Sequence, residues 1–315
     1  MWHFGYREPQ EKGYMQGEEK EEQVQDREEL LKLRTRLLEQ IEQSSRLLAE
    51  VEKSLRTASV PVTEQREAYH STPTVSGMAA TGISKLDDLL RGGYPVPSNI
   101  VLNGPPFSSK EIFASKFIAE SIAENYPIIV LTLDREPLSI MSALGDPAMV
   151  DQWQKSGILT VIDAYSRFVQ VEPMAASAVV IDGSSNISNF MKSIDSVCSR
   201  IIAQAGKYRM VVYSLTGLMT QTDEKTFIRS LQHLSQRRKA EGSVSLYLLE
   251  DGIFERKIYE NVNYFMDISL EFRTEATTEY LRVRGLPSAR TREWVEIIRN
   301  GGSVDLGSFD LKRVR

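Results

Sequence analysis

From Ala79 onward, short apolar runs rich in β-branched residues alternate with longer stretches whose apolar positions recur every three or four residues. The short runs predict strands, and the longer spacing predicts helices. Strands that alternate with helices are typical of parallel βαβ units with helices on both faces of one sheet. The pattern therefore predicts an α/β fold with a mostly parallel sheet over residues 79–315.

Nine strands and five helices are expected from this pattern. The expected strands are Asn99–Leu102, Ile128–Leu133, Ile158–Asp163, Ala178–Ile181, Met210–Tyr213, Val244–Leu249, Tyr264–Phe272, Glu279–Val283 and Trp294–Ile298. The expected helices are Ser84–Leu90, Ser109–Asn125, Leu138–Leu144, Ile187–Ala205 and Glu224–Glu241. The last strands follow one another with short turns, so we expect antiparallel additions at one end of the sheet.

Residues 28–56 carry a different pattern, without glycine or proline. Six of eight positions spaced three or four apart are aliphatic over about four heptads, which is typical of a coiled-coil seam. The eight positions are Leu30, Arg34, Leu37, Ile41, Ser44, Leu48, Val51 and Leu55. We expect a coiled-coil helix that binds a partner helix; the alternative is a helix packed on its own domain.

The segments on either side of this helix lack such periodicity. Residues 1–27 are dense in Glu, Gln and Lys, which predicts a disordered acidic and polar tail. Residues 57–78 are rich in Thr, Ser, Pro and Val and are expected to be a linker. The expected organisation is thus tail, helix, linker and one α/β domain over residues 79–315.

Composition narrows the function classes. The net charge of −5 provides no overall basic field for nucleic acid. Arg229, Arg237, Arg238 and Lys239 bunch on one expected helix, but such a cluster is more often a solvated face. One cysteine and three histidines predict neither a disulfide nor a metal cluster. The absence of a signal peptide or a long apolar run leads us to expect a cytoplasmic protein without a membrane span.

The strand expected at Asn99–Leu102 leads into the loop Gly104–Glu111, which reads Gly-Pro-Pro-Phe-Ser-Ser-Lys-Glu, and then into a helix. This is the context of a P-loop, whose backbone N–H groups wrap phosphates while a lysine reaches the β and γ oxygens. Gly104 and Lys110 stand in register with that pattern. The candidate nucleotide-binding residues are Gly104, Ser108, Ser109, Lys110 and Glu111.

Two residues depart from the P-loop pattern. Ser109 replaces the glycine before the lysine, and its Cβ crowds a backbone that must approach phosphate closely. Glu111 replaces the hydroxyl that holds Mg²⁺. A carboxylate there suits the helix dipole but repels a triphosphate unless Mg²⁺ lies between them. The loop is therefore a degenerate P-loop.

Residues 81–95 read Thr-Gly-Ile-Ser-Lys-Leu-Asp-Asp-Leu-Leu-Arg-Gly-Gly-Tyr-Pro. In order and spacing they resemble the opening signature of KaiC-like RecA-superfamily ATPases. Residues 95–98, Pro-Val-Pro-Ser, also resemble the KaiC-like accessory ATPase of the archaellum motor. The resemblance runs from about Ala79 to Asp305. It implies a RecA-like P-loop NTPase core that, with an intact site, binds ATP with Mg²⁺ and assembles head to tail.

The same resemblance assigns roles to residues beyond the loop. Asp134 matches the first member of an acidic pair that polarises the attacking water, and Arg135 replaces the second member. Tyr213 replaces the aspartate of the Walker B strand. Arg282 and Arg284 resemble a Lys-x-Arg pair that reaches the neighbour's phosphates in a ring. The alternative for these two arginines is an exposed strand with solvated charge.

The step Asp-Ala-Tyr-Ser at residues 163–166 is intact. Four residues depart from the family's pattern: Ser109, Glu111, Arg135 and Tyr213. They lie in the phosphate-binding loop, at the expected Mg²⁺ ligands and in the acidic pair that polarises water. Loss of one preorganised group typically lowers the rate by ~10²–10³. We therefore expect a regulatory or scaffolding pseudo-ATPase that assembles with itself or with a related KaiC-like protein. The alternative is an ATP-binding signal-transduction or motor-accessory ATPase with slow turnover in a ring.

Overall fold

The structure is a computed structural model that describes residues 77–171, 173, 179–181, 187–300 and 303–309. The expected tail at residues 1–27 and the expected coiled-coil helix at residues 28–56 lie outside the described residues, as does the expected linker apart from residues 77 and 78. The α/β domain is therefore the part whose structure bears on function.

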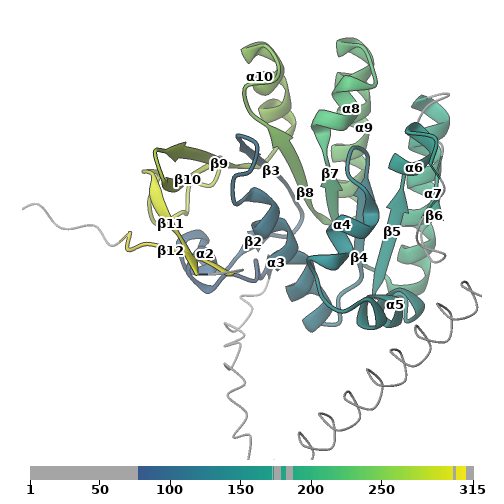
Figure 1. Ribbon diagram of the computed structural model, residues 1–315, viewed down its shortest axis with the longest axis horizontal. Helices are drawn as coiled ribbons and strands as arrows, with labels where there is room; N and C mark the ends of the chain where they lie inside the picture. The colour runs from purple at the N-terminus through teal and green to yellow at the C-terminus, as the bar shows by residue number, and fades with distance from the viewer. Residues whose placement is uncertain (1–76, 172, 174–178, 182–186, 301–302, 310–315) are drawn as a thin grey trace, which may run out of the picture. The chain divides into compact units, whose positions relative to one another are not determined.

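Ten strands of the described residues form one sheet (Figure 1). From one edge to the other they are β12 (Ser303–Leu306), β11 (Val295–Asn300), β10 (Thr278–Arg284), β9 (Ile268–Glu275), β3 (Ser98–Gly104), β8 (Val244–Glu250), β7 (Arg209–Tyr213), β4 (Ile128–Thr132), β5 (Leu159–Asp163) and β6 (Val179–Val180). Pairing is parallel from β9 to β6 and antiparallel from β9 to β12. The mostly parallel sheet with antiparallel C-terminal strands is confirmed.

Helices cover both faces of the parallel strands because each central strand is apolar on both sides. Ile100 and Leu102 of β3 pack into the core on one face, and Val101 packs into the core on the other. The first face carries α2 (Ser84–Leu90), α3 (Lys110–Ala123), α4 (Pro137–Ser142) and α5 (Pro147–Lys155). The second carries α7 (Ile187–Ala205), α8 (Leu215–Thr220), α9 (Glu224–Ala240) and α10 (Arg256–Phe265). A short helix, α6 (Tyr165–Phe168), follows β5.

The opening segment forms a small hairpin of β1 (Met78–Ala79) and β2 (Tyr94–Pro95), with α2 between its strands. Buried Asp87 accepts a hydrogen bond from the backbone N–H of Thr81 at 2.8 Å. A Cβ on Gly82 would lie 2.4 Å from the carbonyl oxygen of Lys116 in α3. The signature at residues 81–95 therefore packs the hairpin against the helix that follows the P-loop.

The sequence located the first elements better than the last ones. Helices α2 and α7 have their expected bounds, whereas the strand expected at Tyr264–Phe272 begins only at Ile268, since residues 264 and 265 end α10. The pattern missed α5, α6, α8, α10, β1, β2 and β12. Helix α10 buries only Ile258 and Val262, so its apolar signal is too short to be recognised.

Candidate P-loop site

The P-loop at residues 104–111 lies at the carboxyl edge of the sheet and runs from the end of β3 into the first turn of α3. The Lys110 side chain is 0% exposed. Its Nζ donates hydrogen bonds to the Pro105 carbonyl oxygen at 2.8 Å and to Glu250 Oε2 at 2.8 Å. Ser108 Oγ lies 3.4 Å from the same Nζ. Lys110, the lysine expected to bind phosphate, is thus bound to the carboxylate of Glu250 at the end of β8.

Ser109 is fully buried and contacts the antiparallel part of the sheet. Its backbone N–H donates to Glu279 Oε2 at 3.1 Å, and its Oγ donates to the same oxygen. Arg299 Nε donates to Ser109 Oγ at 2.9 Å, and the Arg299 guanidinium also pairs with Glu279. An amide of the loop that should face a phosphate therefore binds a side-chain carboxylate.

Glu111 and Arg135, two of the expected departures, form an ion pair with each other. The same guanidinium lies 3.8 Å from Glu250 Oε1. Lys110, Arg135, Glu111 and Glu250 thus form a network of two cations and two anions. The network carries no net charge before any ligand is considered.

Asp134 follows β4 and lies beside α8. Its Oδ2 accepts a hydrogen bond from Ser214 Oγ at 2.5 Å, while its Oδ1 is buried without a hydrogen-bond partner among the described residues. Burial raises the pKa of the Asp134 carboxyl above its ordinary value, although the Ser214 hydrogen bond opposes this effect. A Cβ on Gly217 would lie 2.7 Å from Asp134 Cβ, so α8 confines this side chain closely.

Tyr213 ends β7 in the position expected for a Walker B aspartate. The ring is buried in the core beneath α3, and its hydroxyl lies near Ser115 of that helix. Burial is the main cause that raises the pKa of this phenol, so the hydroxyl stays neutral. Strand β7 therefore supplies no carboxylate that could order Mg²⁺.

The intact step at residues 163–166 has a local structural role. Asp163 accepts hydrogen bonds from the Ser166 backbone N–H at 2.9 Å and from Ser166 Oγ at 2.7 Å. Both residues are buried. These contacts close the turn between β5 and α6.

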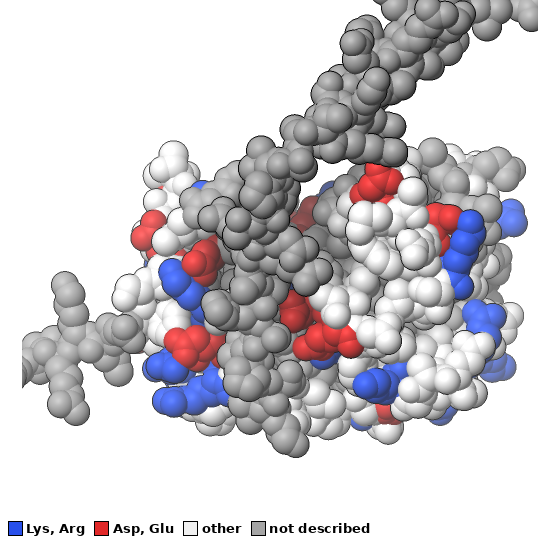
Figure 2. All heavy atoms as spheres, turned by 90° about the horizontal axis from the view of Figure 1, so that it is seen from below, with Lys and Arg blue, Asp and Glu red and all other residues white. Residues whose placement is uncertain are grey.

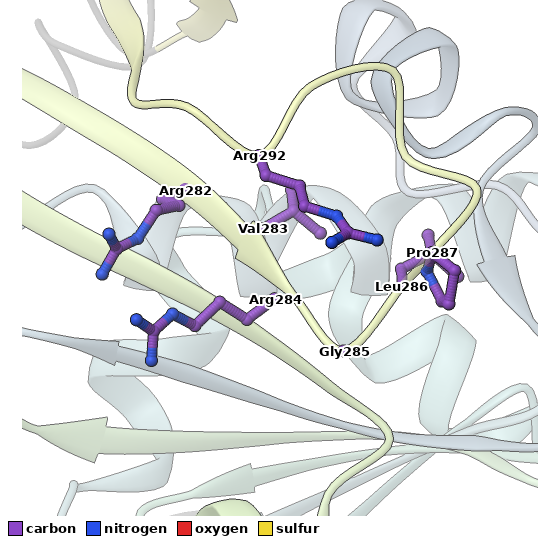
Figure 3. A pocket seen from close by; sticks show the side chains of 7 residues that line it. All are labelled: Arg282, Val283, Arg284, Gly285, Leu286, Pro287 and Arg292. Atoms are coloured by element: carbon purple, nitrogen blue, oxygen red, sulfur yellow. The ribbon is translucent and has the colours of Figure 1, made fainter.

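Arg282 and Arg284 lie on the face of β10 opposite to Leu281 and Val283, whose side chains enter the core with α3. Both arginines bind Glu271: Arg282 Nε at 2.9 Å and Arg284 Nε at 3.3 Å. In Figure 3 both extend to the same side of β10 and, with Arg292, line a pocket of about 470 Å³. The structure therefore does not bring them to the P-loop of their own chain.

Three members of the basic cluster expected on α9 are held in ion pairs. Arg238 is fully buried and binds Asp195 at 2.7 Å, Arg237 binds Glu241 at 2.7 Å, and Lys239 pairs with Asp267. On the face shown in Figure 2, basic and acidic side chains are interspersed. Each of these three charges is thus balanced by a carboxylate of the same chain, and the buried Arg238 departs from the solvated face expected for this cluster.

Sequence reasoning missed Glu250, Glu279 and Arg299. Glu250 directly follows an expected strand, so its place at the carboxyl edge could have been inferred. Glu279 and Arg299 lie on β10 and β11, and only the strand order brings them to the loop.

The residues present do not fit Mg-ATP as they stand. The Ser109 amide and the Lys110 ammonium, which should bind phosphate, both contact carboxylates. Glu111 stands at the position where the hydroxyl ligand of Mg²⁺ is expected, and Tyr213 stands where the aspartate is expected. Within the described ranges, no three His, Cys, Asp or Glu side chains are grouped so that they could hold a metal ion. In the same ranges, no helix has the length and apolar character needed to cross a bilayer.

The P-loop between β3 and α3, the parallel sheet and its antiparallel extension define a RecA-type P-loop ATPase fold. The family model described as "ATPase: KaiC" matches residues 79–302. The chain belongs to this KaiC ATPase family.

Related proteins support the same assignment. A UPF0273 protein of Methanopyrus kandleri is 23% identical over 240 residues, which cover 72% of this chain and 91% of that protein. The circadian clock protein KaiC3 of Synechocystis is 22% identical over 240 residues, or 71% of this chain and 44% of that protein. A KaiC-like protein of Pyrococcus horikoshii has a similar fold, with a TM-score of 0.58 and 18% identity over 73% of this chain and 99% of that one.

Proposed function

We propose that this chain is a pseudo-ATPase that acts as a regulator or scaffold and does not hydrolyse ATP efficiently. The observation that carries the proposal is the pairing of the site's charges within the chain. Lys110 binds Glu250, and Glu111 binds Arg135. In a working site these charges would be balanced by phosphate and Mg²⁺.

Nucleotide binding would have to break contacts that the fold already makes. Lys110 is fully buried, and its partner Glu250 is only 14% exposed. Separation of a buried ion pair typically costs ~3–5 kcal/mol when one charge is left without a partner. A phosphate would restore a partner to Lys110 but would leave Glu250 beside a second anion. Weak or absent nucleotide binding follows from this competition.

Hydrolysis meets a second obstacle, because catalysis of phosphoryl transfer is mostly positioning and electrostatic stabilisation. Tyr213 offers no carboxylate for Mg²⁺, and Arg135 replaces a member of the acidic pair. The remaining acid, Asp134, is buried and hydrogen-bonded to Ser214. Burial raises the pKa of Asp134, which favours its neutral form and weakens it as a group that could polarise water.

A scaffold role needs a surface that a partner can reach. Arg282 and Arg284 lie on the side of β10 away from the core, and Arg284 is 60% exposed. These residues can therefore contact the phosphates bound by a related, active KaiC-like protein in a head-to-tail assembly. The coiled-coil helix proposed for residues 28–56 would add a second contact between chains.

One observation favours the alternative, an ATP-binding ATPase with slow turnover. The Lys110 ammonium already contacts the Pro105 carbonyl and Ser108 Oγ inside the loop, so the loop curls around its lysine. Displacement of Glu250 would then leave a lysine placed for phosphate.

The test is phosphate release from Mg-ATP by the full chain and by Lys110→Ala. We expect equal, background rates for both proteins. Lys155→Ala is the matched control, since Lys155 pairs with Asp151 on the exposed surface of α5. Steady turnover that Lys110→Ala abolishes and Lys155→Ala retains would contradict the proposal, provided that circular dichroism shows both variants folded.

A further inference from the structure

The P-loop is bound by two residues from the antiparallel part of the sheet. These are Glu279 on β10 and Arg299 on β11, and both contact Ser109. We propose that these two residues form an internal clamp in which a carboxylate takes the place of a phosphate, so that the loop accepts a phosphate anion only when the clamp is released. This inference rests on the proposed function, and it identifies the contacts that keep phosphate out of the loop.

Glu279 supplies the anion. Its Oε2 accepts from the Ser109 backbone N–H at 3.1 Å and from Ser109 Oγ, which are donors that a phosphate oxygen would otherwise use. Charge-assisted hydrogen bonds from a backbone amide to a carboxylate are stronger than those between neutral groups. The Glu279 side chain is 12% exposed, so water competes weakly for these bonds.

Arg299 fastens the carboxylate to the loop. Its guanidinium pairs with Glu279, while its Nε donates to Ser109 Oγ at 2.9 Å and its NH2 group donates to the Phe107 carbonyl oxygen at 3.3 Å. One side chain thus binds two residues of the loop and the anion held there. The contact joins positions 190 residues apart in the sequence.

The sheet register explains why these two side chains meet the loop. Glu279 is paired with Ile297, which places Glu279 and Arg299 on neighbouring strands at the carboxyl edge of β3 and β9. Residues at alternate positions on a strand share a face, so Arg299 lies on the same face as Val295 and Ile297. That face packs toward α3 and its P-loop.

Competition follows from charge. Two anions that share one set of donors repel each other, so a phosphate must displace Glu279 from Ser109. Displacement separates Glu279 from the loop amide and also removes the loop contacts of Arg299. Any event that moves the β10–β11 pair away from α3 would therefore open the loop.

The test is calorimetric titration of the full chain with tripolyphosphate and with Mg-ATP. Glu279→Gln keeps the shape and a hydrogen-bond acceptor but removes the competing charge. We expect this variant to bind tripolyphosphate at least tenfold more tightly than the unaltered chain. Glu275→Gln is the control: it makes the same charge change at the end of β9, where Glu275 pairs with Arg273 and not with the loop.

Glu279→Asp gives a second route, because its shorter side chain keeps the charge but draws the carboxylate back from Ser109. It should also raise the affinity for tripolyphosphate. Equal affinities of the unaltered chain and a folded Glu279 variant would overturn the clamp. The proposed function fails separately, if the unaltered chain turns over Mg-ATP. Binding of tripolyphosphate but not Mg-ATP by Glu279→Gln would retain the clamp and show a loop open only to metal-free polyphosphate.

Discussion

The Arg135 guanidinium forms an ion pair with the Glu111 carboxylate at the first turn of α3. The resemblance to KaiC-like ATPases leads us to expect a hydroxyl and a second acid at these two positions, and each charge alone would be unbalanced beside the P-loop. Together they neutralise one another, and the neighbouring Lys110–Glu250 pair is balanced in the same way. The chain's own side chains thus balance the charges around the loop, a role that Mg²⁺ and phosphate would have in a working site.

The first prediction concerns stability without any ligand. Lys110→Ala should lower the free energy of unfolding by about 3 kcal/mol, because it leaves Glu250 nearly buried without its main cation. Lys155→Ala should change it by less than about 1 kcal/mol, since its ion pair is exposed. Urea unfolding measures both. A loss as small for Lys110→Ala as for Lys155→Ala would mean that the buried pair contributes little.

Gly217 in α8 tests the confinement of Asp134. Alanine is the better helix former by about 1 kcal/mol, so propensity alone predicts that Gly217→Ala stabilises the protein. The new Cβ would lie 2.7 Å from Asp134 Cβ and 2.9 Å from its Cγ, and overpacking of this kind typically costs ~1–3 kcal/mol. We expect a net loss in thermal unfolding. A rise in Tm would show that Asp134 has room to move.

The pH dependence of stability tests the burial of Asp134. Its folded-state pKa is raised, so the folded state holds the proton more tightly and stability is lost as pH rises from about 4 through the folded pKa. Asp134→Asn removes this loss, and its stability relative to the unaltered chain should increase from pH 4 to pH 8.

Asp223, the N-cap of α9, serves as the control, because its effect on the pH dependence of stability has the opposite sign to that of Asp134. Hydrogen bonds from Thr226 lower the pKa of Asp223, so its contribution is present above its ordinary pKa and is lost as pH falls. Asp223→Asn should therefore lose stability relative to the unaltered chain as pH rises. The same pH trend in both variants would contradict the assignment of Asp134 as a buried acid.

The segment before the α/β domain provides a test of assembly. If residues 28–56 form a coiled coil, the full chain should have a larger mass in light scattering than a version that lacks residues 1–56, beyond the mass removed. Leu37→Asp in the full chain should have the same effect, because a charge in the seam opposes helix pairing. Unchanged association in both variants would place the contacts between chains elsewhere.

Much of the fold could be predicted because its strands are short apolar runs and its helices carry long periodic faces. The P-loop was found from Gly104 and Lys110, and Glu111, Arg135 and Tyr213 indicated that the site was altered. Their pairing could not be predicted, since Arg135 meets Glu111 only where β4 and α3 adjoin. Glu279 and Arg299 were missed because long-range strand pairing, rather than local pattern, brings them to Ser109.

The most direct test of the central claim is a thermal-shift titration with Mg-ATP on the full chain and on Lys110→Ala. A ligand at one hundred times its Kd would stabilise the folded state by ~2.7 kcal/mol, which is easily seen as a rise in Tm. The internally paired site predicts no Lys110-dependent rise at millimolar Mg-ATP. A saturable rise that Lys110→Ala removes would show that the loop still binds nucleotide, and it would contradict the account of a site closed by its own side chains.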